Sequence, residues 1–236
     1  MKSLYLIIVL APLLGAAVAG LAGGRIGRIN AHRMTVGAVG LSALLSLVVL
    51  YQHVWGGAGV FNETIYQWAA VGGLNLEVGF LVDRLTALMM VIVTSVSFAV
   101  HVYTIGYMYD DPGYQRFFSY INLFTFAMLS LVMANNFLQL FFGWEAVGLV
   151  SYLLIGFWYH KESAIFANLK AFLVNRVGDF GFLLGIAAVL SYYGSLDYAA
   201  VFTAAAAAPD QTMQLFGTEA LVATVVAILM FIGAMG

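Results

Sequence analysis

The chain has 236 residues, of which 63% are hydrophobic and 8% are charged, and its net charge is −2. Soluble domains carry about 25% charged residues, so this sequence lacks the side chains that would cover a water-facing surface. The near-neutral charge gives no reason to expect a nucleic-acid partner. The absence of cysteine excludes disulfides and cysteine-held iron–sulfur clusters. The composition therefore predicts an all-α polytopic membrane protein.

The N-terminus resembles a secretory signal, because Lys2 precedes an apolar run and Ala17-Val18-Ala19 resembles a cleavage site. The apolar run over 4–22 is nevertheless long enough to cross a bilayer, and many more apolar segments follow it. We therefore expect an uncleaved first membrane span.

A helix needs about 20 apolar residues to cross a membrane. Reading between the charged clusters predicts about seven transmembrane helices in one domain, 1–236, as the N-terminal portion of a larger antiporter-like helix bundle. The predicted spans are 3–22, 34–55, 85–109, 117–134, 137–159, 164–193 and 218–236.

The basic residues of the short loops predict the orientation, because Lys and Arg are enriched in cytoplasmic loops. Five of them fall on one side of the predicted spans and two on the other, which predicts an outside N-terminus. The five are Arg25, Arg28, Arg33, Arg116 and Lys161, and the two are Lys2 and Arg84.

The first outside segment, 64–80, alternates apolar and polar residues on its second arm, after Gly72-Gly73. Alternation with a period of two around such a turn predicts an extramembrane β-hairpin. An isolated hairpin is marginal in water, so we expect it to rest on another surface. Two roles stay open, a capping loop and a contact to a neighbouring subunit.

The second outside segment, 195–217, contains Asp197, five consecutive alanines and Pro209. Ser195 is a suitable N-cap for a short helix. Such a helix places Tyr198, Val201 and Phe202 on one face and can lie along the membrane surface. A plain polar linker is the alternative.

The sequence stops at Gly236 inside an apolar run, without a flanking charge or aromatic anchor. Terminal carbonyls and a carboxylate at membrane depth are costly. We therefore expect the 236 residues to be the front part of a longer protein.

Ionisable residues inside membrane spans are costly and are functional candidates by default. Glu145 is the first, because no charged residue lies within a helical turn of it and it lies about 12 Å deep along its span. Gly143, Gly148 and Ser151 are small enough to let another helix approach it. A structural carboxyl, hydrogen-bonded to a neighbouring helix, is the alternative to proton handling.

The following span carries Arg176 and Asp179, three residues apart and therefore on one helix face, where they can pair. Asn175 stands four residues before Asp179 and can hydrogen-bond to its carboxylate. The pair is either a static ion pair that permits insertion or a switchable pair that changes the field at a nearby carboxyl. The spacing does not decide between these roles.

Lys170 and His101 are weaker candidates. Lys170 lies near the cytoplasmic end of its span and can snorkel to the interface, and a single histidine is more often structural than a proton carrier. The histidines at positions 32, 53 and 160 are expected to be solvated. The sequence contains no metal-ligand cluster, no phosphate-binding glycine loop and no nucleophile–base pair.

Three stretches carry a family resemblance. They are 143–158 (GWEAVGLVSYLLIGFW), 170–181 with its Asn-Arg-Val-Gly-Asp segment, and 101–108 (HVYTIGYM). Together they resemble the antiporter-like membrane subunit L of respiratory complex I, the NADH:quinone oxidoreductase. The resemblance covers essentially the whole chain, and the Asn-Arg-Val-Gly-Asp segment separates this subunit from its paralogues.

The resemblance implies roles for named residues. Glu145 corresponds to the essential carboxyl of the proton channel, and Arg176 with Asp179 to the ion pair that gates coupling. The family lysine that faces this glutamate falls beyond Gly236, as do the second half-channel and the lateral helix.

The resemblance also implies that this chain holds no cofactor. NADH, FMN, iron–sulfur clusters and quinone belong to partner subunits. The expected partners are the other membrane-arm and peripheral subunits, protons and the lipid bilayer. The expected location is the bacterial inner membrane or an equivalent energy-coupling membrane.

Two alternatives stay beside this proton-translocating role. One is a subunit of a multisubunit sodium/proton antiporter, which predicts sodium-linked proton flux without NADH. The other is a membrane scaffold with purely structural charges, which predicts loss of assembly when Glu145 is neutralised.

Overall fold

The computed structural model describes residues 1–71, 74–215 and 217–236, which form eight helices and two antiparallel two-stranded hairpins. The helices are α1 (Lys2–Leu21), α2 (Gly23–Val54), α3 (Arg84–Tyr107), α4 (Tyr114–Val132), α5 (Phe137–Ile155), α6 (Glu162–Tyr193), α7 (Tyr198–Ala207) and α8 (Val222–Met235). The strands are β1 (Phe61–Val71), β2 (Leu74–Val82), β3 (Thr212–Leu215) and β4 (Thr218–Leu221).

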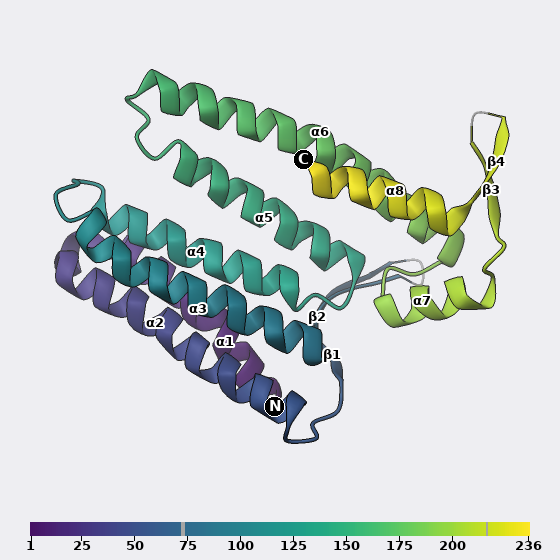
Figure 1. Ribbon diagram of the computed structural model, residues 1–236, viewed down its shortest axis with the longest axis horizontal. Helices are drawn as coiled ribbons and strands as arrows, with labels where there is room; N and C mark the ends of the chain where they lie inside the picture. The colour runs from purple at the N-terminus through teal and green to yellow at the C-terminus, as the bar shows by residue number, and fades with distance from the viewer. Residues whose placement is uncertain (72–73, 216) are drawn as a thin grey trace.

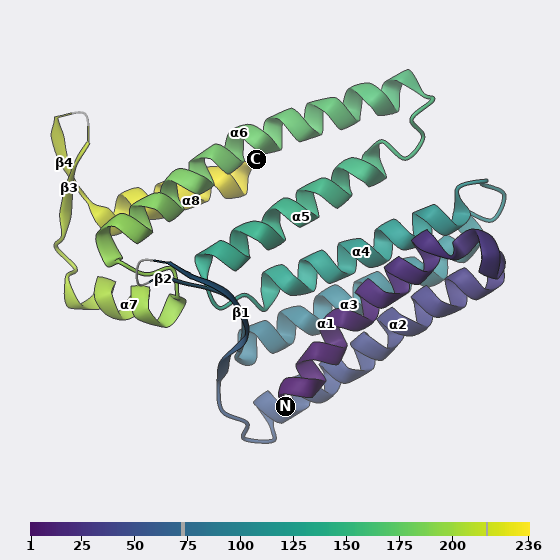
Figure 2. The ribbon, with the colours of Figure 1, turned by 180° about the vertical axis from the view of Figure 1, so that it is seen from behind.

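Helices α1 to α4 pack against one another as a bundle, and α5 lies along α4 with α6 on its other side (Figure 1). Helix α8 returns along the second half of α6, so that the C-terminus lies beside the middle of that helix (Figure 2). The bundle and the α5–α6–α8 layer are therefore joined mainly where α5 meets α4.

Helices lie at all seven predicted span ranges. Five of them, α1, α2, α3, α5 and α6, are long and apolar enough to cross a membrane among the described residues. Helix α4 has 19 residues and α8 has 14. The prediction of an all-α polytopic membrane protein with an extramembrane hairpin is confirmed, and membrane crossing by α4 and α8 stays a prediction.

Two predicted boundaries are wrong. The basic stretch before residue 34 is not a loop, because α2 already begins at Gly23 and bends at Gly27, whose φ of 76° favours glycine. Arg25, Arg28 and Arg33 therefore lie on a helix. The last predicted span begins too early, because residues 218–221 are paired in the β3–β4 hairpin.

The charged residues used for orientation lie at opposite ends of the helices. Lys2 donates to the carbonyl of Thr64 at 3.0 Å at the hairpin end. Arg28 donates to the carbonyls of Tyr109 and Asp111 at the end that holds the turns between α1 and α2, α3 and α4, and α5 and α6 (Figure 1). The direction of this axis across the membrane stays a prediction.

The predicted first hairpin is confirmed as β1 and β2, which pair from Phe61↔Val82 onward. Its predicted turn, Gly72-Gly73, lies outside the described residues. The hairpin rests on the connection between α4 and α5, where the Leu81 N–H donates to the Met133 carbonyl at 2.9 Å. The Gly79 N–H donates to Gln139 Oε1 at 2.8 Å. The hairpin therefore caps its own chain, and a contact to a neighbouring subunit stays a prediction.

The second outside segment contains the predicted short helix, α7. Its N-cap is Asp197 and not Ser195, because the Asp197 carboxylate accepts the Ala200 N–H at 3.1 Å. Ser195 Oγ instead accepts the Asp197 N–H. Val201 is buried, whereas Phe202 is exposed, so the expected common face is only partly covered.

Two histidines are not solvated as predicted. His53 is buried, with Nδ1 3.0 Å from the Val49 carbonyl. His32 lies on α2, with Nδ1 2.9 Å from the Tyr114 hydroxyl. His160 is exposed, as expected. Both histidines lie on helix α2 and not in a loop, and in each the Nδ1 atom faces a protein group instead of solvent.

Candidate functional site

The candidate site lies between α5 and α6. Helix α5 is capped by Asn136, whose Oδ1 accepts the Gln139 N–H at 2.8 Å. This cap sets where the helix begins, so that Glu145 lies in its middle and faces α6. Residue 136 also forms an isolated bridge with Asp197, which ties the start of α5 to the start of α7.

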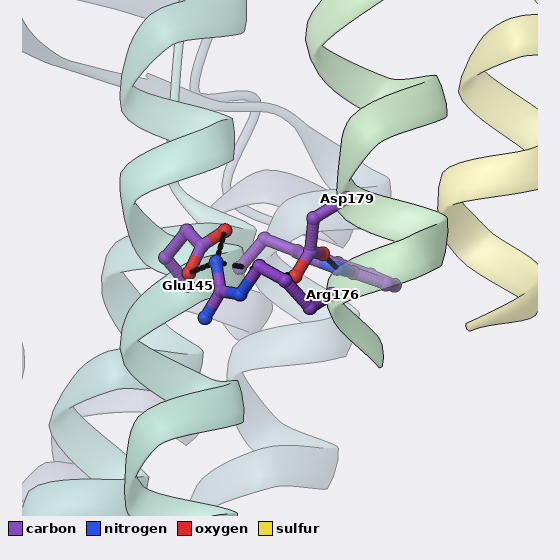
Figure 3. A network of polar contacts seen from close by, with 4 residues as sticks. Glu145, Arg176 and Asp179 are labelled. Atoms are coloured by element: carbon purple, nitrogen blue, oxygen red, sulfur yellow. Dashed lines mark hydrogen bonds and ion pairs between the residues drawn. The ribbon is translucent and has the colours of Figure 1, made fainter. Parts of the chain in front are cut away.

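Three charged side chains meet across the two helices (Figure 3). Arg176 Nη1 lies 2.5 Å from both carboxylate oxygens of Glu145 and 3.4 Å from Asp179 Oδ2. The predicted Arg176–Asp179 pair is therefore present. The structure adds that Arg176 bridges two carboxylates, which the sequence could not show because the contact to Glu145 spans 31 residues.

The three charged side chains are buried to different extents. Asp179 is 7% exposed, Glu145 23% and Arg176 49%. The cluster therefore has a buried carboxylate on one side and a half-exposed cation on the other. A buried charge needs a partner, and for Asp179 that partner is the guanidinium.

Trp144 is a site residue that the sequence reasoning missed. Its indole N–H donates to Asp179 Oδ1 at 3.1 Å, and its ring stacks on Phe182 at 5.8 Å between centroids. An indole N–H inside a membrane span requires an acceptor, which was the available signal. Trp144 thus holds one oxygen of Asp179 while Arg176 faces the other.

A small cavity, about 30 Å³ in volume, adjoins the charged cluster. This is room for one or two water molecules, which need about 10–15 Å³ each by this measure. The cavity is lined by Trp144, Glu145, Gly148, Ser151, Tyr152, Ile155, Ala171, Phe172, Asn175, Arg176 and Asp179. The site can therefore hold water in contact with all three charges.

Helix α8 covers the far side of α6 next to the cluster. A Cβ added at Gly181 would lie 2.8 Å from Ile232 Cγ2, and one at Gly178 would lie 2.9 Å from Gly236 Cα. The small residues around Asp179 thus let α8 approach closely. This contact explains why Asp179 is buried while Arg176 is half exposed.

The structure does not bring every predicted residue to the site. Lys170 is exposed on α6 and does not line the cavity. Asn175 lines the cavity, but no hydrogen bond joins it to Asp179 among the described side chains. The Trp144 indole takes the place of the expected amide.

His101 lies elsewhere, fully buried in the α1–α4 bundle. Its Nδ1 is 2.7 Å from the Ser97 carbonyl, and its ring lies 6.1 Å from that of Phe118. It therefore belongs to a different polar centre. No group of three or more His, Asp or Glu side chains is placed to hold a metal ion in the part of the chain that the structure describes.

Asp111 joins the turns at the end of the helices opposite the hairpin. It accepts hydrogen bonds from the Trp158 indole at 2.8 Å and from the Gly113 N–H at 2.6 Å. Burial raises the pKa of Asp111, but these two donors and the positive charge of Arg116 together hold that pKa below its usual range. The α3–α4 turn is thereby fastened to the α5–α6 turn.

The chain matches two family models. Residues 68–118 match the N-terminal region of chain 5 of NADH-ubiquinone oxidoreductase (complex I). Residues 134–236 match the transmembrane region of the NADH:quinone oxidoreductase/Mrp antiporter family. The second match contains the whole candidate site.

Curated relatives are similar along the entire chain. NADH-quinone oxidoreductase subunit L of Neisseria meningitidis serogroup B is 60% identical over 99% of this chain and 35% of its own length. NADH-ubiquinone oxidoreductase chain 5 of Dictyostelium citrinum is 42% identical over 99% of this chain and 35% of its own length. The chain thus spans about a third of the length of these relatives.

Solved structures share the fold at low identity. The Mrp complex from Dietzia sp. gives a TM-score of 0.75 at 20% identity, over 98% of this chain and 23% of that one. The archaeal membrane-bound sulfane sulfur reductase gives 0.72 at 19% identity, over 96% of this chain and 32% of that one. These two structures show the shared fold. The two family models, over residues 68–118 and 134–236, and the 60% identity to a subunit L over 99% of this chain show that the chain belongs to the family of antiporter-like membrane subunits represented by subunit L (chain 5) of NADH:quinone oxidoreductase.

Proposed function

We propose that this chain is the proton-translocating part of a membrane-arm subunit of an NADH:quinone oxidoreductase. The observation that carries the proposal is the bridge that Arg176 forms between Glu145 and Asp179 beside a water-sized cavity. Ionisable groups at membrane depth are costly and mark ion pathways. Here three of them share one site.

Each residue has a distinct role in this proposal. Glu145 takes up and releases the proton, and Arg176 responds to its charge. When Glu145 is ionised, the guanidinium lies nearer to it, at 2.5 Å, than to Asp179, at 3.4 Å. Protonation of Glu145 removes that attraction and favours the Arg176–Asp179 contact. Formation of the Arg176–Asp179 contact and protonation of Glu145 therefore favour each other.

Water and Trp144 complete the site. Water in the cavity delivers the proton to Glu145, because the cavity touches both carboxylates. Trp144 holds Asp179 in place through its indole N–H, so that Arg176 moves toward a fixed acceptor. Lys170 and His101 lie outside this site, and neither takes part in the exchange between Glu145 and Arg176.

The rest of the reaction belongs to other chains. This chain carries out no redox chemistry and holds no cofactor, and NADH, FMN, iron–sulfur clusters and quinone are bound by partner subunits. Its partners are the other membrane-arm and peripheral subunits, protons and lipid. The proposed location is the bacterial inner membrane, in line with the 60% identity to the Neisseria meningitidis subunit L.

Proton uptake into inverted membrane vesicles tests the proposal. The complete protein carries Glu145→Gln, and NADH-driven proton uptake, electron transfer and assembly of the complex are measured together. We expect assembly to persist and proton uptake per electron to fall. Glu162→Gln is the matched control, because it removes one exposed carboxylate at the start of α6, outside the cavity. It should leave proton uptake unchanged.

The other outcomes separate the alternatives. Unchanged NADH-driven uptake in Glu145→Gln would reject the proposal and would make sodium-linked proton flux the next assay. Loss of the assembled complex in Glu145→Gln, but not in the control, would identify the charges as structural.

A further inference from the structure

The α1–α4 bundle contains polar atoms that have no hydrogen-bond partner. Among the described residues these atoms include Tyr5 OH, Gln52 Oε1 and His53 Nε2, and three that lie in two facing helices, Nε2 of His101 and both polar side-chain atoms of Asn122. His101 and Asn122 are both 0% exposed. Leaving buried polar groups unsatisfied is costly, so a cluster of them in a packed bundle calls for an explanation.

The hydrogen bonds of His101 determine which ring nitrogen carries the proton. Nδ1 lies 2.7 Å from the carbonyl oxygen of Ser97, which can only accept. Nδ1 therefore carries the hydrogen of the neutral ring. Nε2 is then an unprotonated base with a free lone pair. The Ser97 hydroxyl also lies on the Nδ1 side of the ring, 3.3 Å from Nδ1. The same hydroxyl lies 2.5 Å from the Thr125 hydroxyl.

The Asn122 side chain lies beside the imidazole of His101. Helix α1 leaves room for it, because a Cβ added at Gly15 would collide with Asn122 Nδ2. The amide offers both a donor and an acceptor to the ring. Turned so that Nδ2 faces Nε2, the amide would be able to donate to the neutral imidazole. Rotated by half a turn, its Oδ1 accepts a hydrogen bond from a protonated Nε2.

A second histidine, His32, lies near the same aromatic ring as His101. Phe118 lies 6.1 Å from the His101 ring and 6.1 Å from the His32 ring. His32 is only partly buried, and its Nδ1 is 2.9 Å from the Tyr114 hydroxyl. The two histidines thus form a series from the loop end of the bundle to its buried interior, interrupted by Phe118.

We propose that His101 and Asn122 form a proton-binding centre in the α1–α4 bundle, separate from the Glu145 site. The lone pair of Nε2 accepts one proton from hydronium, which becomes water, and the ring gains one positive charge. Nδ1–H remains bonded to the Ser97 carbonyl, and the Asn122 amide rotates so that Oδ1 accepts the new Nε2–H. Asn122 is the positioning residue, because it offers the matching group in each protonation state.

The neighbouring elements contribute the groups that act on this centre. Helix α2 contributes His32, and α4 contributes Tyr114. The Arg28 guanidinium stands 5.6 Å from the Tyr114 ring centroid, nearer to the loop end. Helix α1 contributes Gly15, which has no side chain.

Nitrogen-15 solid-state NMR of the complete protein in bilayers, labelled at histidine, tests this centre. The His101 signals are identified by their loss in His101→Gln. At pH 8 we expect the Nδ1–H tautomer, and at pH 5 a measurable fraction of doubly protonated His101. In Asn122→Leu, which keeps the volume and removes both polar atoms, that fraction should fall about tenfold, because one hydrogen bond to a charged group is lost.

Two further variants keep the test decisive. Thr94→Val is the control, because Thr94 is a fully buried residue of α3, the helix of His101, and donates to the Met90 carbonyl. This variant should leave the His101 signals unchanged. If Asn122→Leu does not fold, Asn122→Asp replaces it, and its carboxylate should increase the doubly protonated fraction at pH 5.

Three results would overturn the inference. They are an Nε2–H tautomer at pH 8, no doubly protonated His101 at pH 5, and equal fractions in wild type and the Asn122 variant. The readout needs no NADH and no transport. It can therefore fail while the Glu145 proposal stands, and the reverse also holds.

Discussion

The α1–α4 bundle and the α5–α6 pair satisfy their polar side chains in opposite ways. In the bundle, buried hydroxyls bond mainly to the carbonyl one turn earlier in their own helix, as Thr35, Ser46, Thr94 and Thr104 do. Between α5 and α6, the polar groups are ions that satisfy one another across the two helices (Figure 3).

This difference determines which region can respond to a proton at Glu145. A hydroxyl bonded to its own helix places no demand on a neighbour, so these hydroxyls do not respond to a change of charge at Glu145. An ion needs its partner, so the contact between α5 and α6 depends on the charge of Glu145. The bundle therefore acts as a fixed support and α5–α6 as the variable element. Four sets of variants test this difference between the two regions.

The largest effect is expected where the two regions join. A Cβ at Gly143 of α5 would lie 2.8 Å from the backbone Cα of Leu131 on α4. Gly143→Ala should force these helices apart and lower the free energy of unfolding by about 1–3 kcal/mol. The measurement is thermal unfolding of the complete protein in detergent.

Gly148→Ala is the control on the same helix, because a Cβ there meets nothing within 4 Å. This variant should be neutral or slightly stabilising, since alanine favours helix over glycine. Equal unfolding midpoints for the two variants would show that α5 does not rest on α4 at Gly143.

The second variant removes the cation that the two carboxylates share. Arg176→Met should leave Glu145 and Asp179 facing each other without a counter-charge and lower the free energy of unfolding by about 2 kcal/mol. The half-exposed guanidinium keeps this below the cost of breaking a fully buried pair. Unfolding midpoints in detergent measure it, with exposed Arg25→Met as the control.

Neutralising both carboxylates in the Arg176→Met variant should restore most of the lost free energy of unfolding, because no unpaired charge would then remain. The triple variant Glu145→Gln, Arg176→Met, Asp179→Asn is therefore expected to unfold later than Arg176→Met alone. If it unfolds earlier, the ions are not what joins α5 to α6.

The third variant concerns the turns that fasten α3–α4 to α5–α6. The pKa of Asp111 is lowered in the folded protein. Its contribution to stability is therefore present above the pKa of the unfolded chain and is lost as the pH falls through the folded value. Wild type should lose stability on acidification through this window, and Asp111→Asn should lose less.

The size of this effect is expected to be under about 1 kcal/mol, because Asp111 is near the surface. The measurement is the unfolding midpoint between pH 7 and pH 3. Asp110→Asn, an exposed neighbour, is the matched control and should follow wild type. Parallel pH profiles for Asp111→Asn and wild type would contradict the prediction.

The fourth comparison is made within the bundle. Ser42 on α2 donates to the Ile8 carbonyl on α1 at 2.8 Å, whereas Ser46 donates to the Ser42 carbonyl of its own helix at 2.7 Å. Ser42→Ala should cost about 1 kcal/mol, and Ser46→Ala less than about 0.5 kcal/mol. Denaturant or thermal unfolding compares them. A larger loss for Ser46→Ala would remove the distinction between bonds within and between helices.

Much of the fold could be predicted from the sequence. Long apolar runs between charged clusters located the helices, because a membrane span must satisfy its backbone within the helix. Alternation of apolar and polar residues located the first hairpin. The start of α2 was missed, because its basic residues were assigned to a loop although they continue a helix past Gly27. The β3–β4 hairpin was missed inside a stretch assigned partly to the last span.

Within the site, the sequence alone determined the three charged residues and the pairing of Arg176 with Asp179. Charges at membrane depth are rare, and a spacing of three residues puts two side chains on one helix face. These inferences need only the composition of a span and the geometry of a single helix.

The tertiary structure was needed to show that Glu145 shares Arg176 with Asp179, that Trp144 holds Asp179, and that His101 lies against Phe118 in a separate bundle. Each of these contacts joins residues of different helices, and its formation depends on how those helices are rotated and stacked. That rotation is set by small residues such as Gly143 and Gly15, through close packing over the whole interface. Such packing leaves no periodic signal in the chain.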